Sequence, residues 1–421
     1  MEPIKAVKGT VDILPARIAA WHRIESVVRM VMRRFGYSEI RTPIFEETGL
    51  FARSIGEDTD IVGKEMYTFR DMGDRSLTLR PEGTASVVRA FVEHRLDQQG
   101  LPQKLWYMGP MFRQERPQKG RQRQFHQFGV EAVGSSSPCL DAEVMHLFDT
   151  VAAELGLDDR VFLINCLGGA ESREKYRDAL VAFLDTVEGD LCEDCRRRKM
   201  TNPLRVLDCK VPGCKEALDK GELPKTVEHL TEDDRAGFEE VQALLTQLGV
   251  KFETSYRLVR GLDYYTGTVF EMQYRGLGAQ SAVMGGGRYD RLIGELGGPD
   301  LPAVGFACGM ERLILAMEVA GTLFADNGID VYVVDAAGDP ARTFNMVTEL
   351  RNADIAADMD TLGRSMKAQM KAAARSGARF AVIIESEEGM VSLKYLAAST
   401  QETMTVGDCI ARIKQNINSD K

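Results

Sequence analysis

The stretch WYMGPMFRQERPQKGRQRQFHQFGVE, residues 106–131, decides the fold of this chain. It begins within one strand-like aromatic run, residues 105–112, and ends within another, residues 125–133, with a polar segment containing proline and glycine between them. Two such runs joined by turn-forming residues predict a β-hairpin. The hairpin loop carries a dense set of cations opposed by a single carboxylate, Glu115; the cations are Arg113, Arg116, Lys119, Arg121 and Arg123.

This charge pattern has two interpretations. Cations so close together repel each other, which favours a loop that binds polyanions, because the planar guanidinium of arginine donates to two phosphate oxygens at once. A hairpin tip that is simply solvated fits the same residues equally well. The rest of the chain must decide between the two.

The composition is that of a globular protein with more than one domain. A chain of 421 residues is too long for a single hydrophobic core and predicts two or three domains. No apolar run approaches the ~20 residues that a membrane helix needs, and residues 1–15 lack an apolar signal core. We therefore expect a cytoplasmic protein without membrane association. The net charge of −10 argues against general nucleic-acid binding but allows a local basic patch, since charges are screened within ~10 Å.

Four of the eight cysteines are spaced as C-x2-C-x13-C-x4-C. This spacing resembles that of zinc ligands, because four thiolates can close a tetrahedron around Zn²⁺. The candidate structural metal site comprises Cys192, Cys195, Cys209 and Cys214. A chance cluster of reduced cytosolic thiols is the alternative.

Hydrophobic periodicity predicts the secondary structure of the first three quarters of the chain. Helical spacing of apolar residues predicts helices at 18–35 and 84–96, the second with Thr84 as its N-cap. Residues 252–274 predict a strand, and residues 281–296 predict a strand that runs through three glycines into a helix. The strand-rich pattern is interrupted from about 170 to 250, which predicts an inserted, mainly helical subdomain.

The pattern changes beyond a boundary at 321–328. Short apolar runs alternate with helical segments at 340–352, 364–375 and 406–417, which predicts a small α/β domain with a mostly parallel sheet. One face of its second helix is basic and is a candidate RNA-binding surface; its residues are Arg364, Lys367, Lys371 and Arg375.

The candidate chemistry depends on arginines. The chain contains no G-x-x-x-x-G-K-[ST] loop and no G-x-G-x-x-G after a strand, so arginines would have to hold any nucleotide. Arg113 ends the first hairpin strand, Arg260 precedes a glycine and a tyrosine pair, and Arg312 stands at a predicted helix start, where the helix dipole favours anions. Each of them alone could be an ordinary ion-pair partner. In combination with acidic and aromatic residues they indicate a site for a polyphosphate and a small cation-bearing substrate; those residues are Glu82, Glu131, Tyr264 and Tyr265.

Five motifs together resemble one family, the histidyl-tRNA synthetases, which are class II aminoacyl-tRNA synthetases. GYSEIRTPIFE resembles the first class motif, with its proline at the dimer interface, MFRQERPQKGRQRQFHQFGVE the second and AVGFACGMERL the third. These class motifs are degenerate by themselves. RLVRGLDYYTGTVFE and GGGRYDRL resemble blocks peculiar to the histidine enzymes and are much more specific.

The resemblance covers nearly the whole chain and implies its architecture. The expected fold is an α+β catalytic domain at 1–325 built on an antiparallel sheet of six or seven strands, and a C-terminal α/β anticodon-binding domain at 328–421. The inserted subdomain at 170–250 would contact the acceptor stem. The implied protein is a cytoplasmic homodimer that uses ATP with Mg²⁺ to convert L-histidine to histidyl-adenylate and transfers the acyl group to histidine tRNA. The four-cysteine segment is not universal in the family and adds a candidate structural Zn²⁺.

The resemblance also implies roles for individual residues. Arg113, Arg260 and Arg312 would be catalytic through their contacts with phosphates. The expected histidine-binding residues are Glu82, Gly83, Thr84, Arg113, Gln127, Glu131, Arg260, Tyr264, Tyr265 and Tyr289. The expected ATP-binding residues are Arg113, Glu115, Arg123, Phe125 and Arg312. The expected tRNA contacts are Arg116, Gln118 and Arg121, with the run Arg196-Arg197-Arg198-Lys199 as a further candidate or a solvated helix face.

Two alternatives belong to other functional classes. A regulatory subunit of ATP phosphoribosyltransferase resembles the catalytic domain, but it lacks the last domain and usually loses the motif arginines, both of which this chain retains. A non-catalytic RNA-binding scaffold would need no amino-acid pocket, so Glu82, Gln127 and Glu131 argue against it.

Overall fold

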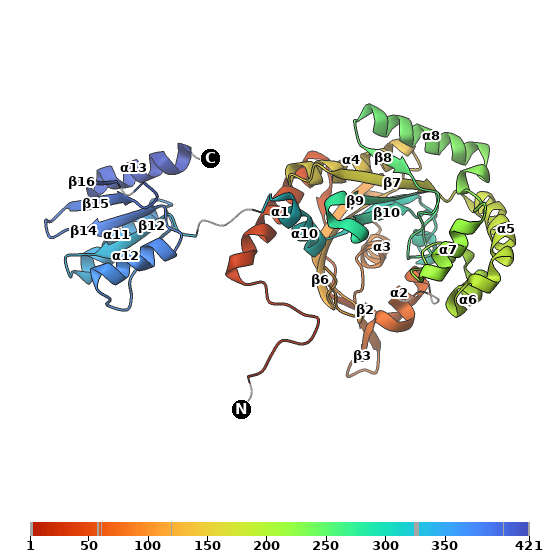
Figure 1. Ribbon diagram of the computed structural model, residues 1–421, viewed down its shortest axis with the longest axis horizontal. Helices are drawn as coiled ribbons and strands as arrows, with labels where there is room; N and C mark the ends of the chain where they lie inside the picture. Colours follow the sequence, from red (N-terminus) through yellow and green to blue (C-terminus); the bar gives the residue numbers. More distant parts are fainter. Residues whose placement is uncertain are drawn as a thin grey trace. The chain divides into compact units, whose positions relative to one another are not determined.

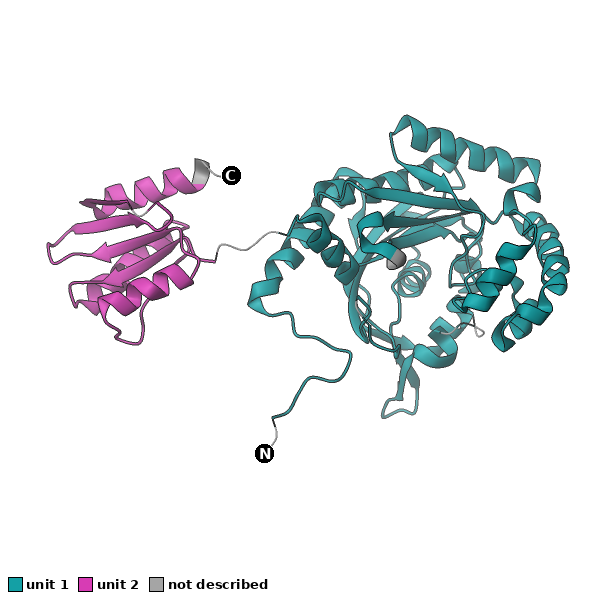
Figure 2. Cartoon of the chain, viewed as in Figure 1, with its two compact units in different colours: residues 1–324 teal, residues 325–421 magenta. Residues whose placement is uncertain are grey.

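The computed structural model describes residues 3–56, 59, 61–118, 120–323, 328–398 and 400–419. Lys119 of the hairpin loop and the centre of the expected 321–328 boundary lie outside the described residues. The chain forms two compact units, residues 1–324 and 325–421, which are coloured separately in Figure 2.

The first unit is built on an eight-stranded sheet with the strand order β1-β5-β6-β11-β10-β9-β7-β8. Its six inner strands are antiparallel, and they are β5 (Gln103–Phe112), β6 (Gln124–Val133), β11 (Ala303–Gly309), β10 (Ala282–Arg288), β9 (Thr268–Tyr274) and β7 (Arg160–Cys166). The edge strands β1 (Ser38–Glu39) and β8 (Phe252–Thr254) pair in parallel with β5 and β7. These edge strands are too short to show an alternating pattern, which explains why the expected six or seven strands are eight.

The two faces of this sheet differ in chemistry because alternate side chains point to opposite faces. On β6, Phe128, Val130 and Ala132 enter the main hydrophobic core, which is covered by helices α1 (Pro15–Arg34), α4 (Pro138–Glu154) and α10 (Met310–Ala320) (Figure 1). The intervening Gln127 and Glu131 therefore point to the opposite face, where α3 (Thr84–Glu93) packs on β6. The polar residues of the predicted site gather on this second face.

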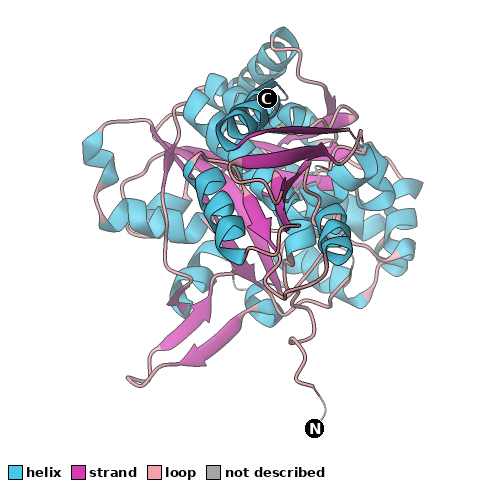
Figure 3. Cartoon of the chain, turned by 90° about the vertical axis from the view of Figure 1, so that its left-hand side faces the viewer, coloured by secondary structure: helices cyan, strands magenta, loops and turns pink. Residues whose placement is uncertain are grey.

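A small second sheet accompanies α2 (Thr48–Ile55) and has the order β2-β4-β3; its strands are β2 (Phe45–Glu47), β4 (Ser76–Leu79) and β3 (Tyr67–Arg70). The predicted extended stretch around Pro43 is thus divided between two sheets, with β1 in one and β2 in the other. The β3–β4 hairpin projects from the lower edge of the unit in Figures 1 and 3.

Two local predictions were wrong. Thr84 does not cap α3: the N-cap position is Gly83, and the Thr84 hydroxyl donates to Glu131 instead. Residues 252–274 do not form one strand, because residues 255–267 leave the sheet as a loop between β8 and β9. The strand and helix predicted within residues 281–296 are present as β10 and the single turn α9 (Leu292–Glu295).

The insertion between β7 and β8 is helical, but its helices pack into two different hydrophobic cores. Helices α5 (Ala170–Thr186), α6 (Glu193–Thr201) and α7 (Pro212–Lys220) enclose a small core of their own, which contains Cys195 and Cys214. Helix α8 (Glu232–Gln247) instead packs on α4, with Phe238 in the main core. Figure 1 shows α8 apart from α6 and α7.

The second unit is a five-stranded sheet with the order β13-β12-β14-β15-β16. Strands β13 (Ala357–Met359), β12 (Val331–Asp335) and β14 (Phe380–Ile384) are parallel, as predicted, and alternate with α11 (Pro340–Asn352) and α12 (Met366–Arg375). An unpredicted antiparallel hairpin of β15 (Met390–Tyr395) and β16 (Gln401–Thr405) precedes α13 (Val406–Ser419). Within the described residues of both units, every helix is too short or too polar to cross a membrane.

Candidate active site

The floor of the candidate site is main chain. One register row across five strands holds, in order, Tyr107, Gly129, Ala307, Gly285 and Glu271. The next row on the same face holds Glu131, Gly305 and Gly287. Small residues in the middle of the sheet, bordered by polar ones, let the side chains of neighbouring segments approach the backbone closely.

Two of these glycines are required by their neighbours. A Cβ on Gly285 would overlap the guanidinium of Arg260, and a Cβ on Gly305 would overlap the carboxylate of Glu131. Side chains at these positions would therefore displace the groups that the sequence marked as functional.

Glu131 is the most buried polar group of the site and has no exposed surface. Thr84 Oγ1 donates to its Oε1 at 2.7 Å, and the Tyr289 hydroxyl donates to its Oε2. Burial raises the pKa of Glu131 to about 8, although both hydrogen bonds favour the ionised form. A carboxyl with this pKa can exchange a proton with a ligand near neutral pH.

Further predicted residues surround Glu131. Tyr264 and Tyr289 have ring centroids 5.5 Å apart, and Tyr265 lies 4.7 Å from Tyr264. Gln127 projects from the same face of β6, and its Oε1 is buried without a hydrogen-bond partner among the described residues. An unpaired buried carbonyl oxygen costs free energy, which a ligand N–H would offset.

Glu82 lies at the start of α3 and is also buried. Its two oxygens accept hydrogen bonds from the backbone N–H groups of Thr84 at 2.7 Å and Ala85 at 2.9 Å, so the carboxylate caps the helix. Burial raises the pKa of Glu82, against the effect of these hydrogen bonds. Gly83, which follows Glu82, packs against the ring of Tyr107, where a Cβ would not fit.

Arg260 extends from the 255–267 loop towards the floor. Its Nη1 pairs with Glu271 Oε2 at 2.9 Å, while its Nε is buried without a partner in the described part of the chain. The side chain of Arg260 is 23% exposed, and its guanidinium lies over Gly285.

Arg113 approaches the same region from the hairpin. Its Nε donates to the Pro81 carbonyl at 2.9 Å, and its guanidinium lies 5.3 Å from the ring centre of Phe125. The charge of Arg113 acts on Glu82, which brings the second motif next to the start of α3.

Arg312 and the hairpin loop bring a second pair of cations together. Arg312 donates from Nε and Nη2 to the Ala282 carbonyl at 3.1 and 3.0 Å. Burial lowers its pKa, and the nearby charge of Arg121 lowers it further. Arg121 is also 3.4 Å from Glu115, the only acid of the loop. Two guanidiniums that repel each other are typical of an anion-binding site.

The remaining hairpin residues lie away from the carboxylate cluster. Arg116 and Gln118 are exposed, and Gln118 forms an isolated bridge with Arg121. Arg123 is held by the N-terminal segment: its backbone N–H donates to Gly9 at 2.7 Å and its Nη1 donates to Lys8 at 3.4 Å.

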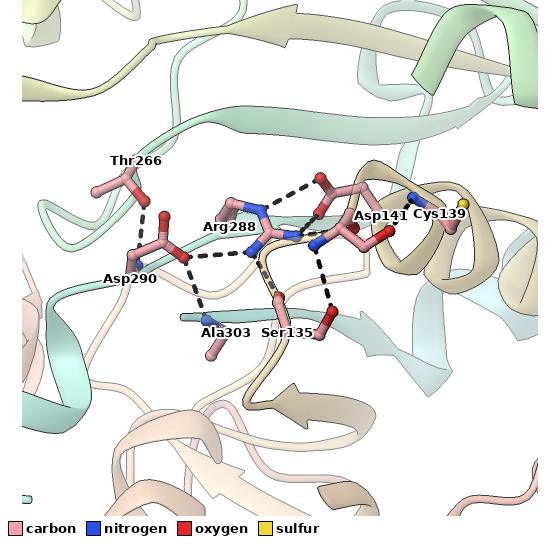
Figure 4. Close-up of polar contacts among 8 residues, drawn as sticks. Ser135, Cys139, Asp141, Thr266, Arg288, Asp290 and Ala303 are labelled. Atoms are coloured by element: carbon pink, nitrogen blue, oxygen red, sulfur yellow. Dashed lines mark hydrogen bonds and ion pairs between the residues drawn. The ribbon is translucent and has the colours of Figure 1, made fainter. Parts of the chain in front are cut away.

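A buried ion pair supports the site from one side, as Figure 4 shows. Arg288 contacts Asp141 at 3.0 Å, the Ser135 carbonyl at 3.0 Å and Asp290 at 3.4 Å. Its carbonyl accepts from the backbone of Thr266, at the end of the 255–267 loop. Because Tyr289 follows Arg288 directly, the pair fixes both that tyrosine and the end of the loop.

Tyr107 and Glu271 were not predicted as site residues. Each lies in the same register row as Gly129 and Gly285, and that cross-strand pairing is not visible in the sequence. The sequence analysis also missed the role of Glu311, which accepts from both the backbone and Nδ1 of His126 at 3.0 to 3.1 Å and ties α10 to β6.

The four predicted metal ligands converge in the insertion. The sulfur atoms of Cys192, Cys195, Cys209 and Cys214 all lie within 4.8 Å of one another. Tetrahedral Zn–S bonds of ~2.3 Å place sulfurs roughly 3.8 Å apart, and Cys192 and Cys209 are 4.0 Å apart. The Cys192 backbone N–H also donates to Cys214 Sγ at 3.1 Å. This donor set fits one Zn²⁺ ion.

An antiparallel sheet with a basic hairpin, and with an arginine at the start of α10 directly after β11, is the catalytic core of a class II aminoacyl-tRNA synthetase. Residues 9–313 match the family model for histidyl-tRNA synthetase, and residues 330–416 match that for an anticodon binding domain. The chain therefore belongs to the histidyl-tRNA synthetase family.

Individual relatives agree with this assignment. The chain is 49% identical to a histidine–tRNA ligase of Cyanothece sp. over 98% of this chain and 96% of the relative. It is 51% identical to that of Moorella thermoacetica over 94% of each. The apo histidyl-tRNA synthetase of S. aureus has a similar structure, with a TM-score of 0.81, 38% identity, and coverage of 98% of this chain and 100% of that one.

A further solved structure is that of an ATP phosphoribosyltransferase regulatory subunit/histidyl-tRNA synthetase from Bacillus halodurans. The match covers 89% of this chain and 97% of that chain with a TM-score of 0.65, but only 21% of the residues are identical. That likeness concerns the fold alone.

Proposed function

We propose that this chain ligates L-histidine to histidine tRNA through a histidyl-adenylate, using ATP with Mg²⁺. The observation that carries the proposal is the buried Glu131–Tyr289–Tyr264 cluster above a glycine floor, with arginines at its rim. Family membership and the close histidine–tRNA ligase relatives support the reaction. Residues 1–325 would be the catalytic domain and 328–421 the anticodon-binding domain, with 170–250 beside the acceptor stem.

The cluster of Glu131, Tyr264 and Tyr289 is suited to bind an amino acid with an imidazole side chain. Glu131 would bond one ring nitrogen and Tyr264 the other, with Tyr289 fixing the Glu131 carboxyl. Burial raises the pKa of Glu131 to about 8, and the carboxylate would accept from a ring N–H when ionised. The unpaired Gln127 Oε1 and the Glu82 carboxylate would accept from the substrate ammonium group, while Gly83, Thr84 and Tyr265 shape the pocket.

Each arginine of the site would contact a particular phosphate of ATP. Arg113 would hold the α-phosphate and the histidine carboxylate, with Phe125 supporting it and contacting the adenine side. Arg312 would bind the terminal phosphates, bridged by the Mg²⁺ that accompanies ATP. Arg260 would stabilise the charge that develops on the α-phosphate during in-line attack by the carboxylate, and preorganised charge of this kind lowers the barrier. Glu115 would orient Arg121 at the same edge.

Arg123 is the weakest of these assignments. Its contacts with Lys8 and Gly9 support a role in anchoring the N-terminal segment beside the hairpin rather than in holding ATP directly.

The exposed hairpin residues are available to tRNA. Arg116 and Gln118 would contact the acceptor end, and Arg121 would contact its backbone. Arg364, just before α12, and Lys371 and Arg375 on α12 border a hollow of about 420 Å³ in the second unit, which suits a flipped nucleotide of the anticodon. The run Arg196–Lys199 is less suited, because Lys199 pairs with Asp185 and Glu188 and is only 6% exposed.

We further propose a cytoplasmic homodimer. Near Pro43, the small sheet exposes Phe45 and Phe69, whose rings are 6.4 Å apart, beside the fully exposed Met72. An apolar patch of this kind is typical of a protein interface. Sedimentation should give a dimer that Phe69→Asp converts to a monomer, while Lys175→Ala, on the insertion, leaves it intact.

The experiment that tests the reaction is ATP–pyrophosphate exchange with each of the twenty amino acids. Exchange with histidine alone is expected, because the pocket pairs both ring nitrogens. A folded chain that binds histidine but exchanges with no amino acid would favour the regulatory-subunit function.

We propose that the four cysteines hold a structural Zn²⁺. The mutual proximity of the sulfurs and the backbone N–H bond to Cys214 are the supporting observations. Elemental analysis of protein purified without chelator is expected to give about one Zn²⁺ per chain, and metal-free protein would contradict the proposal.

A further inference from the structure

The 255–267 loop carries Arg260, Tyr264 and Tyr265, yet it lies outside the sheet. Its position therefore depends on contacts other than a strand ladder. At its far end, the Thr266 backbone is fixed to Arg288. Its first half is held at Ser255 and Leu258 by Ile164 and Asn165 of β7, and around Arg260 by the insertion.

One set of contacts holds the loop just beyond Arg260. Asp263 Oδ1 accepts from Asn202 Nδ2 at 2.8 Å and from Arg205 Nε at 3.0 Å. Arg205 Nη2 also donates to the Gly261 carbonyl at 3.1 Å. The Arg205 side chain is 11% exposed, so this is a packed contact rather than a solvated surface pair.

A second set holds the loop just before Arg260. Arg257 donates to the Leu218 carbonyl at 3.0 Å and pairs with Asp219 at 2.5 Å. Val259, next to Arg260, packs against the small core of the insertion. The loop is thus gripped on both sides of its catalytic arginine.

Both segments of the insertion that contact the loop lie next to cysteines of the four-cysteine cluster in the chain. Asn202 and Arg205 lie in the chain between Cys195 and Cys209, and Leu218 and Asp219 follow Cys214 in α7. The cluster joins these segments, and three of its cysteines are part of the small core itself: Cys195, Cys209 and Cys214. A core of this size holds its helices in place weakly without a cross-link.

We propose that the metal bound by the four cysteines is a positioning device for the catalytic loop, so that metal occupancy in the insertion controls histidine activation. The inference rests on the proposed function and adds a control to it. Metal binding fixes α6 relative to α7, these segments fix Asp263 and Arg257, and the loop then presents Arg260 to the reacting phosphate. A displacement of ~1 Å at such a group can lower the rate by roughly 10²-fold.

The first test uses the full chain with and without metal. Removal of zinc by a chelator is expected to lower kcat of histidine-dependent ATP–pyrophosphate exchange by roughly 10- to 100-fold, with little change in KM for ATP. Added Zn²⁺ should restore the rate, whereas further Mg²⁺ should not. Unchanged exchange by the metal-free chain would overturn the proposal, as would a chain that never binds metal.

A second test retains the metal and removes the contacts of Arg205 with the loop. Arg205→Ala is expected to lower kcat while zinc content and the thermal unfolding midpoint stay near those of the native chain, and Arg205→Lys should recover part of the loss. The matched control is Lys175→Ala, which removes an exposed pair with Glu171 on α5 of the same insertion. Equal kcat in Arg205→Ala and the control would contradict the inference.

A double-mutant cycle identifies the route. In an Arg260→Ala background, zinc removal should cause little further loss, because both changes act through the same group. Independent, additive losses would show that the metal acts elsewhere. If the untreated native chain shows no histidine-dependent exchange, the proposed function fails; if it exchanges regardless of metal, only the positioning role fails.

Discussion

The carboxylate cluster and the arginines around it are held in different ways. Glu131, Gln127 and Glu271 lie on strands, so the ladder register fixes their separations. Arg113 and Arg121 lie on a hairpin loop, and Arg260 lies on a loop fixed by side-chain contacts. Under the proposed function, recognition of the amino acid would depend on the rigid sheet, whereas phosphate chemistry would depend on loop segments that can be displaced without unfolding the core.

The largest expected effect comes from the arginines that lie on loops, which we call the attached half of the site. Arg260→Ala should lower the rate of adenylate formation by roughly 10²- to 10³-fold, because it removes charge that acts on the transition state. The fold should survive, since the residue is not part of the main core. Single-turnover adenylation with circular dichroism as the control checks this, and near-normal adenylation would remove the assigned role.

We call the site residues that lie on strands the rigid half of the site. The buried ion pair between Arg288 and Asp141, which supports this half, gives the next largest effect. Arg288→Met should destabilise the first unit by about 3–5 kcal/mol, because Asp141 would be left buried and unpaired. Urea denaturation measures the loss. The double variant with Asp141→Leu should recover much of it, and a double variant no better than the single one would contradict the ion-pair explanation.

Within the rigid half, Glu131→Gln should raise KM for histidine by roughly 10- to 100-fold, as expected when a hydrogen bond to a charged group is lost. The KM for ATP should change little, because the arginines remain. A parallel rise in both constants would mean that Glu131 supports the pocket as a whole and does not contact the imidazole.

The same variant has a pH signature. Burial raises the pKa of Glu131 to about 8, above the ~4.3 of an unfolded glutamate. Between these values the folded chain binds the proton more tightly, so this contribution to stability is lost as pH rises through about 8. Glu131→Gln should therefore gain in Tm relative to the native chain at pH ~9 compared with pH ~5. No change in the difference would argue against a protonated Glu131.

The smallest effect is expected at the exposed tip. Arg116→Ala should lower tRNA charging by roughly tenfold, about the loss of one charged phosphate contact, and leave ATP–pyrophosphate exchange unchanged. The loss should diminish as salt is raised. A fall in exchange would place Arg116 in the adenylation site instead.

The sequence predicted the rigid half better than the attached half. Alternation and glycines marked β5, β6, β10 and β11, because those patterns reflect local geometry. The 255–267 loop was assigned to a strand, since its aromatic residues have strand propensity and their tertiary partners are invisible in sequence. Thr84 was assigned to a cap for a similar reason: its hydroxyl has a buried partner 47 positions away in the chain.

The insertion is helical, as predicted, but its helices join two different cores. Helical periodicity identified residues 170–250, and cysteine spacing identified the cluster, which the sulfur positions fit. Periodicity does not show which core a helix joins, so the packing of α8 on α4 could not be predicted. Glu271 was missed because a charged residue in a strand is ordinarily solvent-facing.

The glycine floor bears on the accuracy of translation. A pocket wall made of side chains can change rotamer and admit a slightly larger guest, whereas main chain within a paired sheet has no such freedom. Gly285, Gly305 and their strand neighbours therefore set a fixed depth. An enzyme with a wall of this kind can reject oversized amino acids at the first encounter, and it has less need of a separate editing site.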